Sequence, residues 1–112
     1  MRIMNKKHKG NIGEKIASIF LEENGYKIIE TNFRCRIGEI DIIAKKGNKL
    51  IFTEVKSRTS DQYGLPRESI NNKKITTIRK VAAIYLSSKN IDDYDISFDV
   101  IEVYCNHIEN AF

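Results

Sequence analysis

Residues 37–56 read Ile-Gly-Glu-Ile-Asp-Ile-Ile-Ala-Lys-Lys-Gly-Asn-Lys-Leu-Ile-Phe-Thr-Glu-Val-Lys, and this pattern predicts a β-hairpin. Two apolar, β-branched segments flank Gly47-Asn48, and a glycine at the first of two turn residues favours a type II′ turn. With these two residues as the turn, Asp41 lies opposite Glu54 and Glu39 lies opposite Lys56. Because side chains alternate along a strand, all four are expected on one face of the sheet.

The two strands of this hairpin are expected to be central strands. The positions between the charged residues are apolar, namely Ile40, Ile42, Phe52 and Val55. A hairpin at the outside of a protein normally keeps one face polar along its whole length. We therefore expect both strands to be buried on both faces, with a polar patch at one end of the sheet.

The remaining elements follow from periodicity and turn residues. A helix is predicted over about residues 11–24, and Gly25 is expected to end it. Its apolar stripe consists of Ile12, Ile16, Ile19 and Phe20. A second line, formed by Glu14, Ala17 and Leu21, lies beside this stripe. A strand is predicted over 26–33, a polar loop over 57–66, a second helix over 67–88 and a last strand over 96–104. The order predicts an α/β fold with a mixed central sheet flanked by helices, formed by residues 1–112 as a single domain.

The composition favours a cytoplasmic protein. The chain has 112 residues, 30% of them charged, and a net charge of +4. It contains no apolar run of the ~18 residues that a membrane span needs, and its N-terminus lacks the apolar stretch of a signal peptide, so no membrane association is expected. Cys35 and Cys105 are far apart in sequence and are expected to be reduced thiols, with a disulfide as the alternative.

The facing acids Asp41 and Glu54 predict a metal site. At a separation of about 5 Å and an effective dielectric constant near 20, two such charges repel by roughly 3 kcal/mol. Proton sharing, a basic neighbour such as Lys56, or a divalent cation would relieve this repulsion. Mg²⁺ or Mn²⁺ suits oxygen ligands, and the backbone carbonyl of Val55 is a third candidate ligand. The alternative is a solvated strand face on which Glu39 and Lys56 form a cross-strand ion pair.

Three segments together resemble a known family. They are Gly10-Asn-Ile-Gly-Glu14, Gly38-Glu-Ile-Asp-Ile-Ile-Ala44 and Phe52-Thr-Glu-Val-Lys-Ser-Arg58, in this order. They resemble the YraN family of predicted endonucleases, which is similar to Holliday junction resolvases of the PD-(D/E)XK nuclease superfamily. The resemblance implies a restriction-endonuclease-like αβββαβ core. It also implies that Asp41 and Glu54 are metal ligands, that Lys56 is a catalytic lysine and that Glu14 is an additional catalytic acid.

Basic residues around this hairpin predict DNA as the partner. Arg34, Arg36, Arg58 and Lys73 are the candidate phosphate contacts, and residues 1–9 are a candidate flexible basic arm. The combined expectation is a metal-dependent nuclease that hydrolyses DNA phosphodiester bonds. By analogy with the resolvases, branched or structured DNA is the expected substrate. A junction resolvase needs two active sites, so a homodimer is expected under this hypothesis. The alternatives are a catalytically inert nucleic-acid-binding module and an adaptor protein with the same fold.

Overall fold

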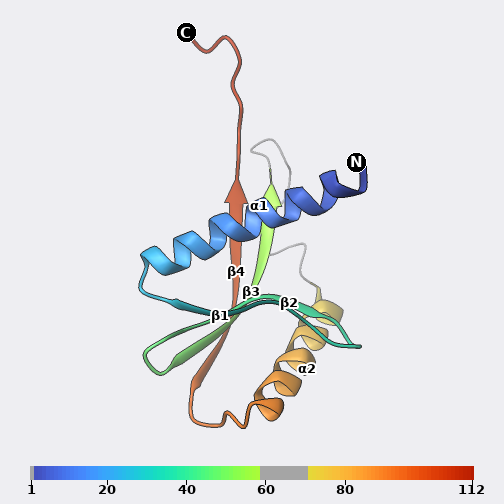
Figure 1. Ribbon diagram of the computed structural model, residues 1–112, viewed down its shortest axis with the longest axis vertical. Helices are drawn as coiled ribbons and strands as arrows, with labels where there is room; N and C mark the ends of the chain where they lie inside the picture. Colours follow the sequence, from blue (N-terminus) through green and yellow to red (C-terminus); the bar gives the residue numbers. More distant parts are fainter. Residues whose placement is uncertain (1, 59–70) are drawn as a thin grey trace.

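The computed structural model has a four-stranded sheet with one helix on each face (Figure 1). It describes residues 2–58 and 71–112, and their side chains from residue 12 onward. The elements are α1 (Arg2–Glu23), β1 (Lys27–Arg34), β2 (Glu39–Lys46), β3 (Lys49–Arg58), α2 (Asn72–Ser88) and β4 (Asp95–Tyr104). This order confirms the predicted mixed α/β fold with an αβββαβ core.

The sheet has the strand order β1-β2-β3-β4, which makes the predicted hairpin its centre. β1 and β3 both pair with β2 in antiparallel orientation, and β4 adds in parallel to β3. The pairing of Lys46 with Lys49 leaves Gly47 and Asn48 as a two-residue turn. Gly47 adopts a φ of +59°, the sign that a type II′ turn needs at its first position. The predicted register of the hairpin is therefore confirmed from residue 42 to the turn.

The core lies on both faces of β2 and β3. Under α2, a buried cluster joins strand residues to the helix residues Val81, Ala82 and Tyr85. Under α1, a second cluster joins Ile42, Ala44 and Ile51 to the helix residues Ala17 and Leu21. Strands covered on both faces read as nearly continuous apolar runs, which explains the density of isoleucine in the hairpin.

The first helix differs from the prediction in its length and in its buried face. α1 begins at Arg2 rather than near residue 11, so the backbone of residues 2–9, the predicted basic arm, is helical. Ala17 and Leu21 are fully buried against the sheet, while the large residues of the neighbouring stripe, Ile12, Ile16, Ile19 and Phe20, remain exposed. Small residues at 13 and 17 let the helix axis approach the strands closely, and this approach decides which line faces the core. The helix ends at Gly25 (φ +89°) as predicted, and the Tyr26 amide donates to the Leu21 carbonyl at 2.9 Å.

The second helix begins later than predicted. Asn71 has an extended backbone, and its side chain accepts a hydrogen bond from the Lys74 amide at 2.9 Å, so α2 starts at Asn72 rather than at 67. The asparagine is an N-cap, which satisfies one of the free amides of the first turn. The expected loop at 57–66 and the first residues of the expected helix fall largely at positions 59–70, outside the described residues.

Two further expectations concern the thiols and membranes. Cys35 and Cys105 are both free thiols, as expected. Within the described part of the chain, neither helix combines the length and the apolar character required to cross a membrane.

Candidate metal-binding site

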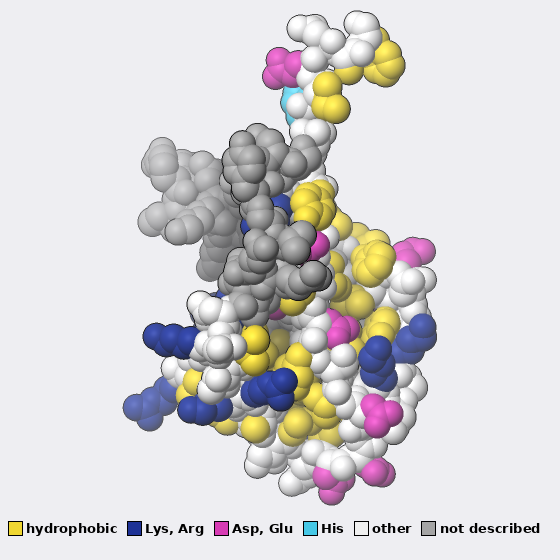
Figure 2. All heavy atoms as spheres, turned by 180° about the vertical axis from the view of Figure 1, so that it is seen from behind, with side chains coloured by type: hydrophobic (Ala, Val, Ile, Leu, Met, Phe, Trp, Pro, Cys, Tyr) yellow, Lys and Arg dark blue, Asp and Glu magenta, His cyan; other side chains and the backbone are white. Residues whose placement is uncertain are grey.

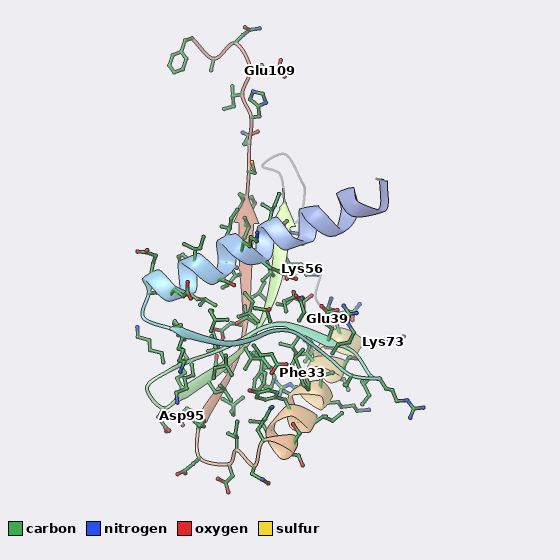
Figure 3. All side chains as sticks on the ribbon, viewed as in Figure 1. Phe33, Glu39, Lys56, Lys73, Asp95 and Glu109 are labelled. Carbon is green, nitrogen blue, oxygen red and sulfur yellow. The ribbon has the colours of Figure 1, made fainter. Side chains whose placement is uncertain are left out.

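The candidate site lies at the end of the sheet where β2 begins and β3 ends. A cleft of about 430 Å³ opens there between the two strands and the first turns of α2. Figure 3 shows Glu39 and Lys73 at this same end of the sheet. The lining of the cleft combines acids from the hairpin with lysines from α2: Gly38, Glu39, Asp41, Glu54, Asn71, Lys73, Lys74, Thr77 and Ile78.

Three acids from two elements converge beside this cleft. One carboxylate oxygen each of Glu14 on α1 and of Glu39 and Asp41 on β2 lies within 4.8 Å of the other two. All three side chains are partly buried. Oxygen atoms at such separations suit a hard divalent cation, and these acids could hold one.

Close packing of α1 on the sheet brings Glu14 to the cluster. The preceding residue, Gly13, is buried, and a Cβ added there would collide with the Ser57 side chain and lie 3.8 Å from a methyl group of Val55. The Ser57 hydroxyl would have to rotate away from a side chain at position 13. Gly13 therefore marks a close approach of α1 to the end of β3, and Glu14 follows directly after it.

Asn32 on β1 connects two of the three acids. Its side-chain amide donates to Glu14 Oε2 and to Glu39 Oε2, both at 3.0 Å. Asn32 has a φ of +53°, a left-handed conformation that asparagine tolerates better than most residues. The Arg34 guanidinium donates to Glu39 Oε1 at 3.2 Å from the paired position on β1. The cluster is thus partly neutralised and held in place from the edge strand.

Asp41 occupies the point at which the hairpin ladder stops. Its Oδ2 accepts a hydrogen bond from the Val55 amide at 2.8 Å, so a side chain replaces the backbone acceptor. The last paired position is Ile42 with Thr53. Alternation also breaks here, since Ile40 joins the cluster under α2 while Ile42 joins the cluster under α1.

The environment of Asp41 raises its pKa from 3.8 to about 6. Burial is the largest cause, because it disfavours the charged carboxylate. The hydrogen bond from Val55 opposes this effect, and the negative charges of Glu54, Glu14 and Glu39 add to it. A carboxylate that is destabilised by its own neighbours gains from a bound cation more than an ordinary surface acid does.

Glu54 lies on the same cleft but is held by lysines. Its Oε2 lies 2.7 Å from Lys74 Nζ on α2 and 3.5 Å from Lys56 Nζ on its own strand. The Glu54 side chain is only 11% exposed. The hydrogen bond with Glu54 is the largest cause of a raised pKa of Lys74. Glu54 is therefore a shared anion between two cations.

The structure brings the predicted acids to one place, with a different internal arrangement. Asp41 and Glu54 line one cleft, and Glu14 lies beside Asp41. The group of three neighbouring oxygens, however, contains Glu39, which the sequence predicted only to lie opposite Lys56, with an ion pair between them as the alternative. In the structure Glu39 pairs with Arg34, and Lys56 pairs with Glu54. The Val55 group that contacts the site is the amide, which binds Asp41.

The predicted phosphate contacts are distributed around this end of the sheet. Arg34 is bonded to Glu39, and Arg36 is exposed in the connection from β1 to β2. Arg58 is the last residue of β3 and is partly buried, and Lys73 lines the cleft from the first turn of α2. Sequence reasoning assigned no role at the site to Asn32 and singled out Lys73 rather than Lys74. For Lys74, the available signal was its position three residues after Asn71, the N-cap that decides where α2 begins.

The variant Asn32→Asp is expected to destabilise the metal-free protein by about 1–2 kcal/mol at pH 7. It loses two hydrogen bonds and adds a negative charge between Glu14 and Glu39. Urea denaturation at low ionic strength measures the effect. Asn32→Gly is the control, because glycine tolerates the same φ and adds no charge. Equal stability of the two variants would contradict a repulsive acid cluster.

Comparison with known proteins extends over nearly the whole chain. The model of the family described as "Uncharacterised protein family UPF0102" matches residues 13–103. A UPF0102 protein of Caldanaerobacter subterraneus subsp. tengcongensis is 48% identical in an alignment of 122 positions that covers 100% of both chains. One of Clostridium acetobutylicum is 49% identical over 121 residues, covering 100% of this chain and 98% of the relative. One of Clostridioides difficile is 50% identical over 114 residues, covering 97% of this chain and 100% of the relative. UPF0102 is the YraN family, so these matches confirm the family that the motifs predicted.

Proposed function

This chain belongs to the uncharacterised protein family UPF0102, and we propose that it is a Mg²⁺- or Mn²⁺-dependent nuclease that hydrolyses DNA phosphodiester bonds. One observation carries the proposal. The oxygens of Glu14, Glu39 and Asp41 lie within 4.8 Å of one another beside a cleft whose opposite wall carries Lys73 and Lys74. Acids that hold a cation and lysines that meet a phosphate are the two halves of a metal-assisted phosphodiesterase site.

The chemistry of the acids supports a hard divalent cation as the cofactor. Asp41 is the proposed central ligand, because its raised pKa marks a carboxylate whose charge lacks compensation. Glu14 and Glu39 are proposed to share the ion, and Glu54 and the Val55 carbonyl are proposed ligands from β3. When bound, such an ion would lower the pKa of a water molecule and polarise the phosphate.

Basic groups near the acids support the binding of phosphate and the stabilisation of its negative charge. Lys56 lies on the strand end beside the acids, where its ammonium would orient the attacking water or stabilise charge on the phosphoryl oxygens. Lys73 and Asn71 line the cleft at the start of α2, and a helix N-terminus favours anions. Arg34, Arg36 and Arg58 are proposed to contact neighbouring phosphates.

Substrate geometry and assembly are proposed from the resemblance to resolvases. Branched or structured DNA is the proposed substrate class, and cleavage of a junction on two strands would need a homodimer with two such sites. The free thiols agree with a reducing compartment, so we propose that the protein acts in the cytoplasm.

The experiment is a cleavage panel of linear, flapped and four-way DNA with Mn²⁺ or Mg²⁺. Wild-type protein is expected to cleave at least one form only when the metal is present. Asp41→Asn, purified in parallel, excludes a contaminating nuclease. DNA binding without cleavage of any form would favour the inert binding module. Absence of both DNA binding and a metal-induced rise in Tm would favour an adaptor protein.

A further inference from the structure

A second cavity lies next to the acidic cleft, between α2 and β4. Among the described residues, α2 packs mainly against β2 and covers this side of β4 only in part, and Phe98 and Val100 are each 40% exposed. The cavity measures about 290 Å³. Its walls are mostly apolar: Ile40, Phe52, Ile75, Ile78, Phe98 and Val100, with Thr53, Glu54, Arg79 and Asp99 as the polar members. We call it the aromatic groove.

The aromatic groove and the acidic cleft are neighbours. Glu54 and Ile78 line both of them. A ligand group that lies in the groove is therefore adjacent to Glu54 and to the two lysines that hold it. A partner that reaches the cleft with a phosphate can reach the groove with the group attached to that phosphate.

The groove has a planar, aromatic wall with a guanidinium beside it. Phe98 stacks on the buried Phe52 with ring centroids 5.6 Å apart and an angle of 25° between the planes. The Arg79 guanidinium carbon lies 5.3 Å from the centre of the Phe98 ring. Aromatic rings and arginine planes are the groups on which proteins stack unpaired bases.

The charge around the groove favours a polyanion over a second copy of this chain. α2 carries Lys73, Lys74, Arg79 and Lys80 and no acidic residue. Figure 2 shows basic side chains gathered around exposed apolar ones on the part of the surface where α2 lies. In a symmetric dimer through this groove, each cationic helix would face its own copy. Of the charged residues that line the groove itself, Arg79 is cationic, and Glu54 and Asp99 are acidic. The charge of Glu54 is balanced by Lys74 and Lys56, so the apolar floor lies beside a cationic helix and complements a nucleotide.

We propose that the aromatic groove binds an unstacked nucleobase of the DNA whose phosphate occupies the acidic cleft. The proposal rests on the proposed action on DNA and extends it to substrate choice. A base in a flap, bulge or junction enters such a groove at a lower unstacking cost than a paired base does. The groove would therefore select structured or single-stranded DNA without reading its sequence.

The test compares two single-stranded oligonucleotides of equal length and charge, one of thymidines and one of abasic residues. Binding is measured by fluorescence anisotropy in EDTA, so that no cleavage occurs. Wild-type protein is expected to bind the thymidine strand about tenfold more tightly. Phe98→Leu, which keeps the position apolar, and Arg79→Gln on exposed α2 are both expected to lose most of this preference.

Tyr104→Ala is the matched control, because it removes another exposed aromatic side chain of β4 that does not line the groove. It is expected to keep the full preference. Equal affinity of wild type for the two strands, lack of binding to both, or an equal loss in Tyr104→Ala would each overturn the inference. So would a shift of the sedimentation coefficient in Phe98→Leu, which would identify a second copy as the occupant. A base preference without cleavage would overturn the nuclease proposal alone, and cleavage without a base preference would overturn this inference alone.

Discussion

Asp41→Asn is expected to abolish metal-dependent cleavage while making the metal-free protein more stable. Asparagine can still accept the hydrogen bond from the Val55 amide, so the local fold is kept and only the charge is lost. Loss of a metal ligand worth about 4 kcal/mol in the transition state corresponds to a decrease in cleavage rate on the order of 10³-fold. A cleavage rate in the variant equal to that of wild type would remove Asp41 from the mechanism.

The pH dependence of stability provides the second part of this prediction. The folded pKa of Asp41, about 6, lies above its ordinary value of 3.8. Folding therefore favours the neutral carboxyl group. Its contribution to the free energy of unfolding is fully present below about pH 3.8 and is lost as the pH rises through about 6. When the effect of the pKa shift is reduced to allow for the partial exposure of Asp41, the loss in the free energy of unfolding amounts to about 1–2 kcal/mol.

Urea denaturation in EDTA from pH 3.5 to pH 7.5 measures this effect. Wild type and Asp41→Asn should be equally stable at the acidic end, and the variant should be more stable above about pH 6. Saturating Mn²⁺ should stabilise the wild type and leave the variant unchanged. A constant difference between the two proteins across this range would contradict the raised pKa.

Glu54→Gln is expected to abolish cleavage while strengthening metal-free binding of DNA. The substitution removes the anion that holds Lys74 at 2.7 Å and Lys56 at 3.5 Å, so both ammonium groups become available to phosphates. Each additional phosphate contact should steepen the salt dependence of the association constant by roughly 0.7–0.9. Anisotropy titrations in EDTA at several salt concentrations measure affinity and slope together.

Glu109→Gln is the matched control for this charge change. Glu109 lies in the C-terminal segment after β4, far from the cleft (Figure 3). Its substitution removes the same charge and should leave the salt slope unchanged. Weaker DNA binding in Glu54→Gln would show that Glu54 positions the two lysines for DNA rather than restraining them.

The hairpin could be predicted from sequence because its determinants are local. Gly47-Asn48 defines the turn, and the turn defines the register of every pair down to Ile42 and Thr53. The density of isoleucine on both faces predicted central strands, and β2 and β3 are the inner strands of the sheet. The fold class followed from the order of the elements alone.

The fine structure of the site depends on contacts that sequence spacing does not encode. The reach of Asn32 to Glu14 and Glu39 depends on a left-handed residue in an edge strand. The contact of Lys74 with Glu54 depends on where α2 begins, which the cap at Asn71 decides. The buried line of α1 depends on close approach at Gly13 and Ala17 rather than on the larger apolar stripe, which the described residues leave uncovered.

The central claim is that the acids of β2 and α1 bind a divalent cation. An anomalous difference map from crystals of the wild-type protein soaked in Mn²⁺ tests it most directly. We predict a peak within metal–oxygen bonding distance of an Asp41 carboxylate oxygen and of at least one oxygen of Glu14, Glu39 or Glu54, and no such peak in Asp41→Asn. A map without a peak at this cleft, or with the same peak in both proteins, would contradict the account.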